Sequence, residues 1–226
     1  MISPLPSQKC KKTPVSFGTE PAALPIVHWT LARSKLPSVP SPFPMAKPEH
    51  WINSLVCVRP SGSVGLGVFA TVAIPPGTLL FQMDDSRVVT PEAPLRPTMG
   101  EDGKYCDYLG PNLIVHNGIP ERFVNHSCDP NAHVATRNGS RWEVTIRRIA
   151  AGEELTNDYS INGIEDDPQE VIHIWTCQCG SSRCREKIVH SFFKLPRQQQ
   201  LEYLPLLDAW FKVLYGEQIA RLLTEH

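Results

Sequence analysis

The chain has 226 residues, with 22 Lys and Arg against 23 Asp and Glu, a net charge of -1 and 41% hydrophobic residues. This composition is typical of a soluble globular protein with one or two domains, and it excludes the concentrated positive charge that direct nucleic-acid binding requires. No apolar run approaches the roughly 20 residues of a membrane-spanning helix, and no apolar core of a secretion signal follows Met1. We therefore expect no membrane contact and an intracellular protein of the nucleus or cytoplasm.

Residues 1–48 are dominated by proline. Ten of the 22 prolines of the chain fall in this segment, interleaved with Ser and Lys, and no helical or alternating apolar pattern is present. Such a composition cannot bury enough apolar surface to offset the entropy of ordering the backbone. We predict that residues 1–48 are disordered.

Short extended runs follow. Residues 55–58, 67–70 and 78–82 are rich in β-branched and large apolar side chains, and residues 75–77, Pro-Pro-Gly, form a turn signal before the third run. These runs predict β-strands. Residues 85–104 contain several prolines and two glycines, which predict a loop or a variable insert.

The clearest β-hairpin joins residues 132–137 to residues 141–148 through Asn138 and Gly139, a dipeptide well suited to positive φ. Apolar and polar side chains alternate along its second strand, so we expect that strand to bury one face. The two faces carry Trp142, Val144 and Ile146 on one side and Arg141, Glu143, Thr145 and Arg147 on the other.

The last segment, residues 191–226, has a different period. Its large apolar residues recur at three- and four-residue steps, which is typical of an amphipathic helix. They are Leu201, Leu204, Leu207, Phe211, Leu214, Ile219, Leu222 and Leu223. We predict a C-terminal helix or helix pair that covers a sheet.

Three stretches carry residue types that the fold alone does not explain. Gly65-Leu66-Gly67 is by itself weak evidence for a functional site, because glycines occur in any tight turn. In residues 122–131, RFVNHSCDPN, turn chemistry accounts for the Asp-Pro-Asn end but does not require the preceding His126 or Cys128. Residues 152–159 resemble ordinary turn-to-strand sequence that ends in Tyr159, a residue type that usually packs with its hydroxyl satisfied.

Cysteines form the fourth constellation. The chain has 7, an odd number, and three of them lie at 177, 179 and 184. A disulfide between Cys177 and Cys179 would be strained, and in a reducing compartment clustered cysteines more often bind metal. Zinc prefers four thiolates in a tetrahedron, and Cys128 is the best candidate for the fourth ligand. We predict a structural zinc site formed by Cys128, Cys177, Cys179 and Cys184.

In chain order, these four stretches resemble a SET domain followed by a post-SET segment, as found in protein lysine methyltransferases that use S-adenosylmethionine. The resemblance runs from about residue 54 to residue 186, and no cysteine cluster precedes residue 128 that could form a pre-SET segment. It implies a mainly β, β-clip-like fold of small curved sheets with a knot-like crossing, a zinc-bound post-SET loop and the C-terminal helices. The implied boundaries are 49–162 for the SET domain, 163–190 for the post-SET segment and 191–226 for the helical tail.

The resemblance also implies roles for individual residues. Tyr159 would be the catalytic residue at the point of methyl transfer, and the four cysteines would be the post-SET zinc ligands. The methyl donor would be held by Gly65, Leu66, Gly67, Val68, Arg122, Asn125, His126, Tyr159 and Trp175. The implied substrate is a lysine of a protein or peptide, a histone being one candidate.

The chain departs from the family pattern at two places. Asn157 stands where the family usually has Phe or Tyr, an aromatic that controls how many methyl groups fit. Residues 115–121 replace the usual small-residue lead-in to the Arg-Phe-x-Asn-His-Ser motif. Two alternatives to a lysine methyltransferase therefore stay open: a catalytically silent SET-like interaction module, and a SET-fold enzyme that acts on a small molecule.

Overall fold

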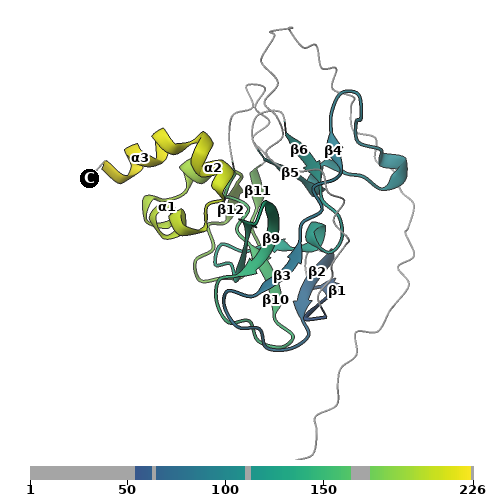
Figure 1. The fold of residues 1–226 in the computed structure, drawn as a ribbon. Helices are drawn as coiled ribbons and strands as arrows, with labels where there is room; N and C mark the ends of the chain where they lie inside the picture. Colours follow the sequence, from purple (N-terminus) through teal and green to yellow (C-terminus); the bar gives the residue numbers. More distant parts are fainter. Residues whose placement is uncertain (1–53, 63–64, 110–112, 164–173, 225–226) are drawn as a thin grey trace, which may run out of the picture. The chain divides into compact units, whose positions relative to one another are not determined.

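The computed structural model describes residues 54–62, 65–109, 113–163 and 174–224 (Figure 1). The predicted disordered segment, residues 1–48, lies outside the described residues. No helix within the described part of the chain combines the length and the hydrophobicity that crossing a bilayer needs.

The described chain is mainly β and forms four small sheets rather than one large one (Figure 1). A four-stranded sheet has the order β1-β2-β10-β7, and a three-stranded sheet has the order β3-β9-β8. The first sheet consists of β1 (Val56–Ser61), β2 (Gly65–Ala70), β10 (Glu154–Asn157) and β7 (Asn125–His126). The second consists of β3 (Leu79–Gln82), β9 (Ser140–Thr145) and β8 (Ala132–Arg137).

The other two sheets come from segments where the sequence signal is weaker. A three-stranded sheet has the order β4-β6-β5, and a two-stranded sheet pairs β11 with β12. Their strands are β4 (Val88–Val89), β5 (Cys106–Tyr108), β6 (Ile114–His116), β11 (Ile174–Thr176) and β12 (Lys187–Val189). The predicted insert, residues 85–104, thus contains one short strand and also two 3-10 turns, η1 (Pro97–Met99) and η2 (Gly103–Tyr105).

Two segments far apart in the sequence meet in the first sheet. β7 pairs in parallel with β10, with Asn125 opposite Thr156 and His126 opposite Asn157. Ser127 continues the contact, because its backbone N–H donates to the carbonyl of Asn157 at 2.8 Å. The segment that ends in Cys128 therefore lies beside the segment that ends in Tyr159, as the resemblance implies.

A continuous apolar core supports this sheet. Val68, Leu80, Phe81, Ile149 and Leu155 are each 1% exposed or less and belong to one cluster. The predicted strand runs supply most of these side chains, which explains why the extended patterns were informative. Burying a large aliphatic or aromatic side chain stabilises the fold by about 1.5–3 kcal/mol relative to leaving it exposed.

The expectation that β9 buries a single face is wrong. The hairpin itself forms as predicted, with Asn138 and Gly139 at positive φ. However, the polar face of β9 is the more completely covered one, since Arg141 is 3% exposed and Glu143 is 0% exposed, whereas Trp142 is half-buried.

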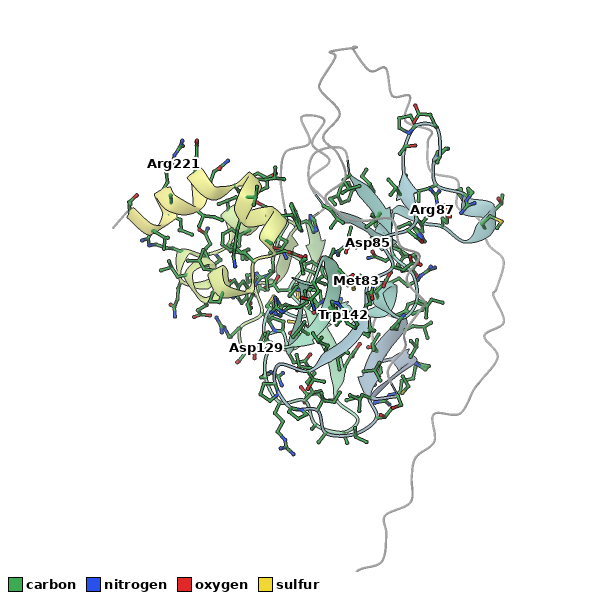
Figure 2. All side chains as sticks on the ribbon, viewed as in Figure 1. Met83, Asp85, Arg87, Asp129, Trp142 and Arg221 are labelled. Atoms are coloured by element: carbon green, nitrogen blue, oxygen red, sulfur yellow. The ribbon has the colours of Figure 1, made fainter. Side chains whose placement is uncertain are left out.

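Charge pairing explains why this polar face can be buried. The two terminal nitrogens of Arg141 donate to Asp85 at 2.7 Å and to Asp107 at 2.5 Å, so the buried cation is neutralised by two carboxylates (Figure 2 labels Asp85). Glu143 accepts a hydrogen bond from Asn157 at 3.0 Å. Buried charges persist when they are paired in this way.

The C-terminal segment is helical as predicted but is divided into short pieces. The elements of this segment are η4 (Phe192–Lys194), α1 (Arg197–Tyr203), η5 (Leu204–Leu206), α2 (Ala209–Leu214) and α3 (Gly216–Thr224). A further 3-10 turn, η3 (Glu121–Phe123), lies earlier in the chain, between β6 and β7. Pro205 cannot continue α1, and the side chain of Asp208 caps α2 by accepting from the N–H of Ala209 at 2.6 Å. Three short α-helices therefore stand where a helix or helix pair was expected.

Aromatic residues fill the core of this helical segment. Phe192 and Phe211 are each 0% exposed, and their rings meet edge to face with centroids 5.6 Å apart. By contrast, Leu214 and Leu223 are 50% and 55% exposed, so part of the predicted apolar stripe does not face the core.

Candidate active site and metal centre

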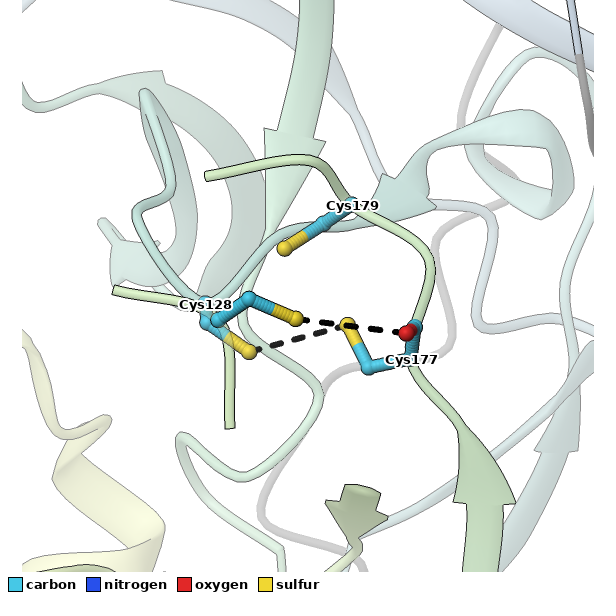
Figure 3. A group of neighbouring side chains, drawn as sticks. Cys128, Cys177 and Cys179 are labelled. Carbon is cyan, nitrogen blue, oxygen red and sulfur yellow. Dashed lines mark hydrogen bonds between the residues drawn. The ribbon is translucent and has the colours of Figure 1, made fainter. Parts of the chain in front are cut away.

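Four cysteines converge on one point. Cys128 approaches from the loop after β7, and Cys177, Cys179 and Cys184 lie on the loop between β11 and β12 (Figure 3). Their sulfur atoms all lie within 4.8 Å of one another, and none of them forms a disulfide. The Sγ atoms of Cys128 and Cys177 are 3.7 Å apart. A tetrahedral zinc ion with Zn–S bonds of about 2.3 Å requires sulfurs about 3.8 Å apart, so these residues fit zinc.

The backbone around the cluster favours thiolate ligands. The N–H of Arg185 points at Cys128 Sγ at 3.3 Å, and the N–H of Glu186 points at Cys184 Sγ at 3.4 Å. Gly180 turns the loop with φ of 69°, a left-handed conformation that glycine adopts without strain. N–H groups directed at sulfur stabilise its negative charge, as a zinc ligand needs.

Tyr159, the predicted catalytic residue, packs against this cysteine cluster. Its hydroxyl donates to the backbone carbonyl of Val124 at 2.9 Å, and its backbone N–H donates to His126 Nδ1 at 3.2 Å. Burial raises the pKa of Tyr159 far above its ordinary value, with nearby carboxylates adding to the effect. The hydroxyl is therefore protonated at neutral pH and acts as a hydrogen-bond donor rather than as a base.

His126 joins the tyrosine to the cysteines. Its Nδ1 accepts from Tyr159, and its Nε2 lies 3.3 Å from Cys128 Sγ, with the side chain only 4% exposed. Burial lowers the pKa of His126 to about 4, although Asp158 opposes the shift. Both ring nitrogens are thus engaged inside the protein, so any contact of His126 with a donor molecule would use its backbone.

Asn125 connects the same segment to the glycine-rich strand. Its side-chain amide donates to the carbonyl of Leu66 at 3.0 Å and to Glu154 Oε1 at 2.7 Å. A Cβ atom at Gly67 would collide with the Glu154 carboxylate, so a larger residue would have to displace that side chain, and Gly65 adopts a positive φ of 88°. Val68 is 0% exposed in the core, so at this position only the backbone could face a ligand.

Arg122 and Trp175 are the two remaining residues predicted to bind the methyl donor. Arg122 lies in η3, donates from Nε to the carbonyl of Gly118 at 3.0 Å and lies over the ring of Tyr105 at 5.6 Å. Trp175 belongs to β11, opposite Ile188 of β12.

A cavity of about 150 Å³ opens beside Tyr159. Asn157, Glu143 and Val124 contribute to its wall, as do Arg122 and Trp210. Two residues of the site were not predicted from the sequence. Glu143 carries no signal beyond an alternating strand pattern, whereas Arg185, which binds the residue before Tyr159, directly follows the last cysteine of the cluster and could have been considered with it.

Comparison with known proteins agrees with this geometry. Residues 65–160 match the family described as the SET domain, so the comparison supports a SET domain in this part of the chain.

The similar proteins are named as histone-lysine N-methyltransferases. The H3 lysine-9 specific enzyme KMT1 of Fusarium mangiferae is 38% identical over 92 residues, covering 34% of this chain and 26% of its own length. An H3 lysine-4 specific enzyme of Mycosarcoma maydis is 34% identical over 130 residues, covering 53% of this chain and 9% of its own length. The probable enzyme set-23 of Caenorhabditis briggsae is 39% identical over 112 residues, covering 47% and 41%. The chain therefore spans less than half the length of each of these relatives.

Proposed function

We propose that this protein is an S-adenosylmethionine-dependent protein lysine N-methyltransferase. The observation that carries the proposal is Tyr159, whose protonated hydroxyl is fixed 2.9 Å from the Val124 carbonyl at the wall of a cavity, beside the glycine-rich strand and Asn125. The names of the relatives make histones the first substrate class to test. They also favour an intracellular location, in the nucleus or cytoplasm.

The methyl donor would be bound by one group of residues. When bound, S-adenosylmethionine supplies a methyl group on a positively charged sulfur. The residues assigned to its pocket are Gly65, Leu66, Gly67, Val68, Arg122, Asn125, His126, Tyr159 and Trp175. Because the side chains of Asn125 and His126 are bonded within the protein, these two residues would contact the donor through their backbone.

Tyr159 would orient the attacking amine. A free lysine has a pKa near ~10.4 and must lose a proton before its nitrogen can act as a nucleophile. A partly desolvated cavity and a nearby positive sulfur both lower that pKa. The hydroxyl of Tyr159, held by its hydrogen bond to the Val124 carbonyl, would then confine the nitrogen in line with the methyl carbon, and such alignment supplies much of the rate enhancement.

The zinc site would serve structure rather than chemistry. Cys128, Cys177, Cys179 and Cys184 would hold one zinc ion, and this ion would anchor the loop that packs on Tyr159. The segment 163–190 would thus act as a post-SET segment, following a SET domain at 49–162 and preceding the helical tail at 191–226.

Replacing Tyr159 by phenylalanine tests the proposal. We expect the rate of methyl transfer to fall about 100-fold or more, because a single lost orienting group at the reacting atoms has effects of this size. The measurement is transfer of labelled methyl from S-adenosylmethionine to core histones and to proteins of a cell extract.

Tyr215→Phe is a matched control, because Tyr215 is a buried tyrosine of the helical segment. Equal transfer by Tyr159→Phe and wild type would refute the catalytic assignment. Absence of donor binding in calorimetry would instead favour the silent interaction module. Donor binding accompanied by methylated metabolites, and no methylated protein, would favour the small-molecule enzyme.

Asn125→Ala separates the donor pocket from the metal site. The substitution removes two hydrogen bonds that hold Leu66 and Glu154 beside Asn125, and we expect donor affinity to fall about tenfold or more. Zinc content should stay at the wild-type level, because Asn125 contacts none of the four cysteines in the described structure. Loss of zinc from Asn125→Ala equal to that from Cys128→Ser would show that the two sites cannot be separated.

A further inference from the structure

An unusual pair of polar side chains lies beside Tyr159. Glu143 is 0% exposed, and its Oε2 accepts a hydrogen bond from Asn157 Nδ2 at 3.0 Å. Among the described residues, neither Glu143 Oε1 nor Asn157 Oδ1 has a hydrogen-bond partner, although both atoms are buried. Leaving a buried acceptor unpaired is costly, so two adjacent cases call for a ligand.

Both side chains face the cavity that Tyr159 also lines. Its volume of about 150 Å³ matches the space of roughly five water molecules, which suffices for the end of an alkylamine. Arg141, the buried arginine of the described lining, does not neutralise Glu143. Its two terminal nitrogens are already engaged by Asp85 and Asp107.

Acidic side chains predominate in the lining of the cavity. Carboxyl groups outnumber positive side chains in it by five to three. The five acids are Asp107, Glu121, Glu143, Asp158 and Asp208, and the three cations are Lys104, Arg122 and Arg141. Burial also raises the pKa of Glu143 to about 8, although its hydrogen bond to Asn157 opposes the shift. A positive ligand beside the carboxyl would return it to its charged form.

We propose that Glu143, held in place by Asn157, is a specificity-determining residue that recognises the ε-amine of the target lysine and restricts the enzyme to monomethylation. This inference rests on the proposed function and deepens it. Asn157 is hydrogen-bonded to Glu143 in the cavity wall, so the two unpaired acceptor atoms belong to neighbouring side chains.

The number of N–H groups explains the restriction. After the lysine ammonium loses one proton to water, its neutral nitrogen keeps two N–H groups and one lone pair. The two N–H groups pair with Glu143 Oε1 and Asn157 Oδ1, and the lone pair is left to form the N–C bond while the C–S bond breaks with its electrons going to sulfur. The methylammonium product then releases a proton to water.

A second methylation meets a mismatch. The neutral monomethylamine has one N–H, so one of the two acceptors stays buried and unpaired, and a methyl group is placed against a polar atom. An unpaired buried acceptor lowers the rate of the second transfer by about tenfold or more relative to the first.

The number of methyl groups added per lysine can be measured without knowing which lysine is the target. Core histones are incubated with the full-length protein and S-adenosylmethionine, hydrolysed to amino acids, and analysed by mass spectrometry for mono-, di- and trimethyl-lysine. Wild type should give monomethyl-lysine in at least tenfold excess. Glu143→Gln and Asn157→Phe should each lower that excess several-fold, because each removes one of the two acceptors.

Glu153→Gln is the matched control for these variants. Glu153 is a partly exposed glutamate that pairs with Arg147 at 2.8 Å and does not line the cavity. It should leave the product ratio unchanged. Comparable amounts of mono- and trimethyl-lysine from wild type would overturn the inference while leaving the proposed function intact.

A binding experiment tests the amine site independently of catalysis and of variant folding. The side-chain amide signals of Asn157 in ¹⁵N-labelled wild type are followed during titration with butylammonium and with butyltrimethylammonium. Butylammonium should shift these signals at a concentration at least tenfold lower, because only it offers N–H donors. Equal binding of the two ions, or no response of Asn157, would refute the amine site. Selective binding in a protein that transfers no methyl would support the amine site and reject the proposed function.

Discussion

Replacing Arg185 by methionine is expected to lower the free energy of unfolding by about 3–5 kcal/mol and the rate of methyl transfer about 100-fold, because it leaves a buried carboxylate without its partner. Arg185 binds Asp158 through two hydrogen bonds, Nη1 to Oδ2 at 2.6 Å and Nη2 to Oδ1 at 2.8 Å. The side chain of Asp158 is 0% exposed. Although burial raises the pKa of Asp158, its bonds to Arg185 leave that pKa below the ordinary value.

The expected loss of activity follows from the position of Asp158. It directly precedes Tyr159, and Tyr203 of α1 also donates to its Oδ2 at 3.1 Å. An unpaired Asp158 carboxylate would have to move toward water or take up a proton, and either change would shift the tyrosine. A displacement of about 1 Å at a reacting group can cost about 100-fold in rate.

Arg183→Met provides a control two residues away in the same loop. Arg183 pairs with Glu202, but both side chains are substantially exposed, at 42% and 36%. Exposed ion pairs contribute little to stability, because water screens their attraction. Denaturant unfolding and the histone methylation assay should therefore distinguish the two variants clearly. Similar losses of stability in both would show that the Arg185–Asp158 pair is not the buried support described above.

Arg185 also connects the two centres of the site. Its guanidinium holds Asp158, and its backbone N–H points at Cys128 Sγ at 3.3 Å. A change in the cysteine cluster would therefore reach Tyr159 by two routes, through Arg185 and Asp158 and through the imidazole of His126.

The parts of the site that could be predicted from the sequence are those with local spacing. Cys177, Cys179 and Cys184 lie on one short loop, and Gly65 and Gly67 lie in one strand, where Gly65 has a positive φ and Gly67 leaves space for the Glu154 carboxylate. In both cases the chemical requirement is met by residues close together in the chain. Cys128 could be predicted as the fourth ligand because it lies in a run of consecutive polar residues rather than in an apolar strand pattern.

The buried charges could not be predicted in this way. Asp85 and Asp107 lie 56 and 34 residues from Arg141, and Asn157 lies 14 residues from Glu143. The alternation of apolar and polar residues along β9 assigns each side chain to one of two faces. It does not show which groups of other strands pack against each face. Only the sheet arrangement decides that the polar face meets carboxylates and an amide, and is therefore the more deeply buried face.

Removing the metal should have the largest effect on the fold. We expect about one zinc ion per chain by metal analysis, and Cys128→Ser should lose it. Because structural zinc contributes its binding free energy directly to folding, the unfolding midpoint of this variant should fall by more than about 10 °C. Hydrogen exchange should show opening of the β11–β12 hairpin, where the N–H of Cys177 bonds the carbonyl of Glu186 at 2.8 Å.

Cys106→Ser controls for the loss of a thiol alone. Cys106 is half-buried in β5, outside the group of four cysteines that could bind metal. Its replacement should leave zinc content and donor binding at wild-type levels. Cys128→Ser should lose both, because the cysteine sulfur contacts His126 and the backbone of Arg185, which together position the Tyr159 segment. Retention of zinc by Cys128→Ser would remove Cys128 from the ligand set. Loss of zinc with unchanged donor binding would instead show that the metal loop and the donor pocket fold independently.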